Sequence, residues 1–125
     1  MKHLKPLFFL VVFLASFFNP CVADEASINM HYKGNHGTHS EYYPPADMPE
    51  VHYDDNLEQI IIVGDGFADY YDVEIVSLGS LQTVIATQVD GYGDSINVSS
   101  LSIGDYRIVI TSSNNNVFEG DFAIE

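Results

Sequence analysis

Apolar and polar residues alternate along most of the chain after residue 50. Tyr106, Ile108 and Ile110 are separated by Arg107 and Val109, so the first three point to one face of an extended segment. A repeat of two residues is typical of a β-strand with one buried face. No segment in this region shows the 3.6-residue spacing of an amphipathic helix, and the pattern therefore predicts an all-β domain.

Turn-forming Gly, Asn and Asp residues separate the alternating segments. They divide the chain into about seven short strands with a spacing of roughly ten residues, as in immunoglobulin-like sandwiches. A small barrel is the alternative. The apolar run Ile60–Val63 predicts a central strand that is covered on both faces. The predicted antiparallel strands cover residues 51–53, 57–63, 71–78, 82–89, 95–98, 105–111 and 117–124.

Five residues near the C-terminus are candidates for structural positions. Tyr106 comes two residues after the turn residue Gly104 and shortly after Leu101, where many β-sandwiches use a corner tyrosine to hold a loop against a strand. Gly120 and Phe122 continue the alternation in the last predicted strand. These residues indicate a fold rather than an activity.

The first 23 residues have the features of a secretory signal peptide. A basic start is followed by an apolar run from Leu7 to Phe18 and by the small residue Ala23. The run is too short to span a bilayer of about 30 Å. We therefore expect a secreted or periplasmic protein, and the alternative is a surface lipoprotein that is acylated at Cys21, the only cysteine.

Residues 24–50 form a loop-rich lead-in to the sandwich domain, which we expect at residues 51–125. Pro44, Pro45 and few apolar residues favour loops in the lead-in. Residues 28, 30 and 32 are apolar or aromatic and alternate with polar ones, so one strand is expected at a sheet edge.

The charge of the chain excludes several classes of partner. There are 18 acidic residues against 4 Lys and Arg, and removal of the signal would leave only Lys33 and Arg107, for a net charge of −16. Nucleic-acid binding requires cations that neutralise phosphates, so no nucleic-acid partner is expected. The chain is long enough for one small domain.

Several of these segments together resemble a family of small secreted immunoglobulin-like domains of unknown function from gut Bacteroides and their relatives. The resemblance rests on the run Leu57–Val63, on Asp72–Ile75, on Ile96–Tyr106 and on the closing Phe118–Ile124. It covers approximately residues 50–125 and is firmest over the last thirty. It implies an exported sandwich domain without assigned catalytic residues.

A histidine-rich loop is the one group of residues that suggests metal chemistry. His31, His36 and His39 lie close together with acidic residues nearby, and imidazole with carboxylate is a ligand set for zinc or copper. Their spacing matches no metal motif, and glycines at 34 and 37 do not preorganise the loop. Metal binding through these three histidines is therefore the second functional hypothesis, and no resident cofactor is expected.

The first hypothesis is a non-catalytic module of the cell envelope that binds another protein or a glycan. No serine lies in a nucleophile motif, so an enzyme is not expected. Exposed tyrosines on loops can stack on sugar rings or anchor protein partners, and Tyr42, Tyr43, Tyr70 and Tyr92 lie nearest to predicted loops. The pattern defines neither the ligand nor the oligomeric state.

Overall fold

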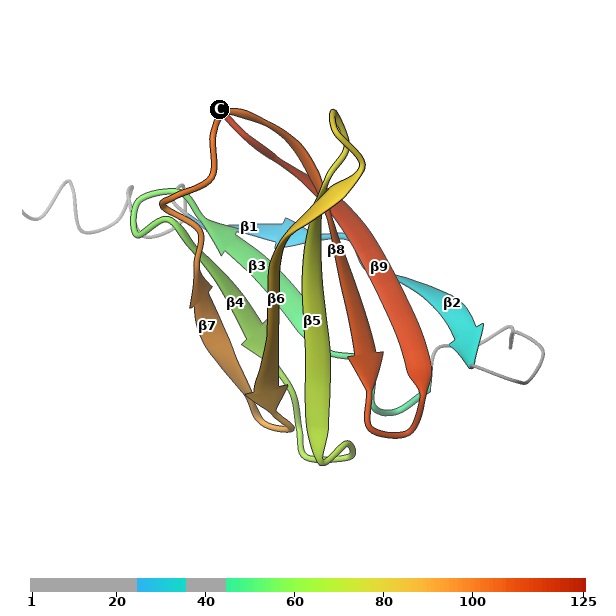
Figure 1. The fold of residues 1–125 in the computed structure, drawn as a ribbon. Coiled ribbons are helices and arrows are strands. Elements are labelled where there is room, and N and C mark those ends of the chain that lie inside the picture. The colour runs from blue at the N-terminus through green and yellow to red at the C-terminus, as the bar shows by residue number, and fades with distance from the viewer. Residues whose placement is uncertain (1–24, 36–44) are drawn as a thin grey trace, which may run out of the picture.

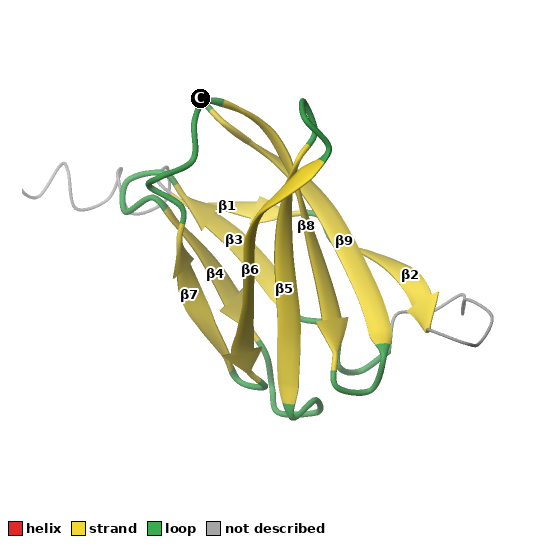
Figure 2. Cartoon of the chain, viewed as in Figure 1, coloured by secondary structure: helices red, strands yellow, loops and turns green. Residues whose placement is uncertain are grey.

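The computed structural model describes residues 25–35 and 45–125, and all regular structure in these ranges is β-strand (Figure 1, Figure 2). The predicted signal peptide and Cys21 lie outside the described residues. Within those residues there is no helix with the length and apolarity to cross a membrane. The strands are β1 (Glu25–Ile28), β2 (His31–Asn35), β3 (Glu50–Asp54), β4 (Gln59–Val63), β5 (Tyr70–Ser77), β6 (Gln82–Asp90), β7 (Gly93–Asn97), β8 (Gly104–Ser112) and β9 (Asn116–Ile124).

These strands form two antiparallel sheets that pack face to face. One sheet has the order β1-β3-β4-β7 and the other the order β2-β9-β8-β5-β6. The chain changes sheets between β4 and β5, returns between β6 and β7, and changes again between β7 and β8. The predicted all-β sandwich is confirmed, and two separate sheets replace the alternative of one closed barrel.

The described residues contain nine strands in all, and the seven from β3 to β9 correspond to the seven predicted for residues 51–125. The lead-in supplies two strands, where alternation suggested one. Asn29 and Met30 interrupt the extended chain, so that β1 joins the edge of one sheet beside β3 and β2 joins the edge of the other beside β9. Ile28 and Met30 are both buried in the core.

Gly120 lies where this change of sheets crosses β9. A side chain at this position would place its Cβ 2.8 Å from both the carbonyl oxygen of Asn29 and Sδ of Met30, and 2.9 Å from Ile28. Real Cβ contacts are longer, so only glycine allows the lead-in to pack this closely on β9. Gly120 is thus the point at which the lead-in packs against β9.

The core consists of the inward-facing residues of both sheets, as the alternation predicts. In β5, Tyr71 and Val73 are buried whereas Asp72 and Glu74 are exposed. The expectation that Ile60–Val63 is covered on both faces is wrong. Ile60 and Ile62 are buried, but Val63 is 45% exposed, because each sheet of a two-layer sandwich has only one covered face.

Tyr106 makes the contact expected of a corner tyrosine. Its hydroxyl donates to the carbonyl oxygen of Ser102 at 2.6 Å, four residues upstream, which holds the loop between β7 and β8 against β8. Leu101, in the same loop, packs half-buried against the core, and Gly104 is the first residue of β8. The ring of Tyr106 stacks on Phe122 with centroids 5.7 Å apart.

Candidate functional site

Three connections meet at one end of the sandwich: the β4–β5 loop (residues 64–69), the β6–β7 turn (91–92) and the β8–β9 turn (113–115). Main-chain bonds link the first two. The amide of Gly64 donates to the carbonyl of Tyr92 at 3.0 Å, that of Gly66 to Gly91 at 3.2 Å, and that of Gly91 to Asp69 at 3.1 Å. The loops therefore support each other, although they are distant in sequence.

Glycine is required at two of these positions. A Cβ on Gly91 would overlap the carbonyl oxygen of Ala68, so the two backbones can approach only without a side chain there. Gly66 has a φ of +88° and lies under the ring of Tyr92, whose Cζ would be 2.8 Å from an added Cβ. The ring of Tyr92 is thus supported by backbone.

We call Phe67, Tyr70 and Tyr92 the aromatic loop end. Phe67 and Tyr92 are 65% and 72% exposed, and Tyr70 is 39% exposed at the start of β5. Exposed carboxylates of Asp65 and Asp69 lie in the same loop. Rigid aromatic side chains with hydrogen-bond acceptors beside them can contact the flat face of a sugar ring or an apolar side chain of a protein.

A buried aspartate joins the lead-in to this end of the molecule. Asp47 is 3% exposed, and its carboxylate accepts hydrogen bonds from the side-chain amides of Asn114 at 3.0 Å and Asn116 at 3.1 Å. Its carbonyl oxygen accepts a 2.8 Å bond from the hydroxyl of Tyr71. Burial, with further contributions from Asp47 and Asp65, raises the pKa of Tyr71 from 10.0 to about 12.

The same polar contacts extend to the aromatic loop. The Asn114 amide also donates to the carbonyl of Phe67 at 3.3 Å, and the amide of Asp69 donates to Oγ of Ser113 at 2.7 Å. The amide of Ser113 also donates to the carbonyl of Tyr70 at 3.0 Å, so both Phe67 and Tyr70 are connected to the β8–β9 turn. This arrangement holds the aromatic residues before any ligand binds, which lowers the entropic cost of binding.

Of the four tyrosines predicted for a contact surface, the structure brings Tyr70 and Tyr92 to the same end. Tyr42 and Tyr43 lie outside the described residues. Phe67 belongs to the same surface, and the sequence pattern of tyrosines near loops did not predict it. Its position directly after Gly64-Asp65-Gly66 marks an apolar residue in a loop, and this signal would have identified it.

The predicted metal ligands are described only in part. His31 is exposed on β2, and His36 and His39 lie outside the described residues. Residues 25–35 and 45–125 contain no group of three side chains suited to hold a metal ion. His52 lies 3.7 Å from the carboxylates of both Glu25 and Glu50, and so connects β1 and β3.

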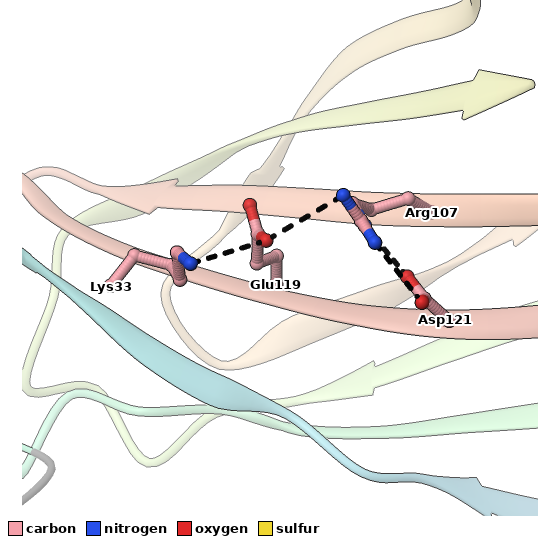
Figure 3. Close-up of polar contacts among 4 residues, drawn as sticks. All are labelled: Lys33, Arg107, Glu119 and Asp121. Atoms are coloured by element: carbon pink, nitrogen blue, oxygen red, sulfur yellow. Dashed lines mark hydrogen bonds and ion pairs between the residues drawn. The ribbon is translucent and has the colours of Figure 1, made fainter. Parts of the chain in front are cut away.

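Lys33 and Arg107 are paired with acidic residues on the outer face of β2, β9 and β8 (Figure 3). Arg107 Nε donates to Asp121 at 2.7 Å, and Glu119 lies 3.9 Å from Arg107 and 3.6 Å from Lys33. The hydrogen bonding between Arg107 and Asp121 raises the pKa of Arg107 and lowers the pKa of Asp121, because it stabilises the charged form of each group. These exposed pairs offer an anionic ligand little uncompensated positive charge.

Comparison with solved structures identifies the fold. The chain is similar to the crystal structure of a DUF3244 family protein from Bacteroides vulgatus with an immunoglobulin-like β-sandwich fold, with a TM-score of 0.62. This chain is an immunoglobulin-like β-sandwich. The match covers 81% of this chain and 99% of the solved one at 10% sequence identity, so the likeness shows the fold alone.

Two other comparisons found no relatives. No protein-family model matches the chain, and no curated protein matches its sequence. The solved neighbour belongs to a family named only as a domain of unknown function, so it assigns no chemistry to the aromatic loop end.

Proposed function

We propose that this chain is an exported, non-catalytic binding module of the cell envelope, and that its aromatic loop end contacts a glycan or another envelope protein. The observation that carries the proposal is the exposure of Phe67 and Tyr92 on loops that are held by their own backbone bonds. Export is supported by the signal-like residues 1–23.

Large apolar groups that are exposed to water are costly in free energy. Phe67, Tyr70 and Tyr92 expose aromatic surface, and their covering by a ligand would be favourable at about 25 cal/mol per Å². Because main-chain bonds already hold these loops together, little of this energy is spent on ordering them. Aromatic residues of this kind dominate the energy of many interfaces.

The test compares two variants of the protein purified from cells that express the full chain. Phe67→Ser with Tyr92→Ser removes the two most exposed side chains of the aromatic loop end, whereas Ile103→Ser removes an exposed apolar side chain (79% exposed) at the opposite end. Both are assayed on arrays of bacterial and host glycans and by cross-linking in envelope extract. Circular dichroism checks that both retain the parent's fold.

We expect the double variant to lose roughly thirtyfold or more in affinity for whatever the parent binds, since two central aromatic contacts are removed. The Ile103→Ser variant should bind as the parent does. Equal binding by the parent and the double variant would show that the ligand contacts another surface. Turnover of a bound glycan or peptide would refute the non-catalytic role.

A further inference from the structure

The outer edge of β6 differs from every other sheet edge in the described residues. β6 has nine residues, of which only the last, Asp90, is charged. At the other edges, β1 and β7 have four and five residues, and β2 is interrupted by a bulge between Tyr32 and Gly34. Proteins protect exposed edges with charges, bulges or short strands, and the stretch Ile85–Val89 of β6, although no longer than β7, contains neither a charge nor a bulge.

A bulge limits the accessible stretch of β6. Val76 pairs with Thr83 and Ile75 pairs with Ile85, so Val84 is the extra residue and the strand twists there. From Ile85 to Val89 the pairing with β5 is regular. This second part is therefore the stretch to which another strand can bind.

The direction of the free backbone groups follows from the ladder. The amide of Gly91 donates to the carbonyl of Asp69, and bonds in an antiparallel pair involve every second residue. Every second residue back from Gly91 therefore bonds to β5, and Thr87 is one of them. Ala86 and Gln88, on either side of Thr87, direct their N–H and C=O groups away from β5. These two residues offer up to four main-chain hydrogen bonds to an added strand.

The charges beside this edge define what the added strand should carry. On the outer face, Glu74 of β5 lies directly across from Ala86, and Asp72 lies across from Gln88. Asp72 accepts a 2.9 Å bond from the side-chain amide of Gln88, whereas within the described residues the exposed Glu74 accepts only a long bond, of 3.5 Å, from the hydroxyl of Thr83. Because Ala86 has only a methyl group, a long cation on the added strand can extend over it to Glu74, across about 10 Å.

We propose that β6 binds an extended segment of a partner protein by strand addition at Ile85–Val89, and that this segment carries Lys or Arg on the face it shares with Glu74. The strongly negative charge of the chain disfavours a second copy of itself as the occupant and favours a basic segment. Main-chain bonds supply affinity in this mode of recognition, and side chains at alternate positions supply specificity. The inference concerns a separate surface and does not depend on the proposed role of the aromatic loop end.

The test uses three synthetic peptides and the full-length protein. The first peptide alternates Thr or Val with Lys, the second has Glu in place of Lys, and the third is the Lys peptide with alternate amides N-methylated. Two variants carry the same change of charge: Glu74→Lys beside β6, and Asp55→Lys in the exposed β3–β4 loop. Binding is measured by calorimetry, and the amide signals of Ala86 and Gln88 are followed by hydrogen exchange.

We expect the parent and Asp55→Lys to bind the Lys peptide and to protect the amides of Ala86 and Gln88. Glu74→Lys should bind it roughly three- to tenfold more weakly than Asp55→Lys does, because a cross-strand pair becomes repulsive. The N-methylated peptide, which keeps the charge and loses the ladder bonds, should not bind. Equal binding of the N-methylated peptide, no protection at Ala86 and Gln88, or dimerisation of the protein through β6 would each overturn the inference.

Discussion

The hydroxyl of Tyr71 provides a direct test of the contact that joins the lead-in to the sandwich. Tyr71 is fully buried, and its hydroxyl donates to the carbonyl oxygen of Asp47, a residue that is itself 3% exposed. In Tyr71→Phe the carbonyl of Asp47 loses its hydrogen-bond donor, and because the site is buried, water does not readily replace that donor. Leaving a buried polar group unsatisfied costs about 1–3 kcal/mol.

Tyr106→Phe is the matched control, since it deletes the same atom. The hydroxyl of Tyr106 donates to Ser102 at 2.6 Å, but Ser102 is exposed, so water can replace the lost donor. Its cost should be close to the net value of one hydrogen bond, about 0.5–1.5 kcal/mol. Tyr71→Phe should therefore be the more destabilising of the two substitutions.

Urea unfolding followed by far-ultraviolet circular dichroism measures this difference. The midpoint should fall in both variants, and further for Tyr71→Phe, with an unchanged dependence on urea concentration. In a domain of this size each 1 kcal/mol also lowers the melting temperature by roughly 4–8 °C. A Tyr71→Phe variant as stable as Tyr106→Phe would refute the reasoning that the carbonyl of Asp47 is shielded from water.

Three further predictions concern stability. The pKa of Tyr71 is 10.0 in the unfolded chain and about 12 in the folded protein, so the folded state holds the proton more tightly. The contribution of Tyr71 to stability should therefore be full below pH 10 and fall by roughly 2–3 kcal/mol as the pH rises to about 12. Unfolding curves of Tyr71→Phe should show a smaller decline over the same pH range. Gly91→Ala should lower the melting temperature in calorimetry, because its Cβ would overlap the carbonyl oxygen of Ala68, and an unchanged transition would show that the loops are not in contact. Ile108→Ala, at a fully buried position, should cost about 2–5 kcal/mol in urea unfolding, whereas Ile103→Ala should cost almost nothing; similar losses in both would contradict the assignment of the core.

The alternation of apolar and polar residues was sufficient to predict most strands and their buried faces. It works for β5 and β8 because each has one face in the core and one in water. It fails for the lead-in, where a two-residue interruption at Asn29 and Met30 changes the sheet without breaking the alternation. It also overstates the burial of Val63, since a run of apolar residues does not show how many faces are covered.

The candidate site could be predicted only in pieces. Tyr70 and Tyr92 are 22 positions apart, and their location at one end depends on two changes of sheet, between β4 and β5 and between β6 and β7. The buried carboxylate of Asp47 gave no signal, because its partners Asn114 and Asn116 are distant in sequence. Contacts of this kind require the connectivity, which the alternation does not contain.

The central claim is that the aromatic loop end is ordered before it meets a ligand, and amide hydrogen exchange on the free protein tests it most directly. The amides of Gly64, Gly66 and Gly91 donate to main-chain carbonyls in neighbouring loops. We predict that all three exchange much more slowly than an unstructured chain, and that exchange becomes faster at these positions in Gly91→Ala. Exchange of all three at the rate of an unfolded peptide would contradict the account.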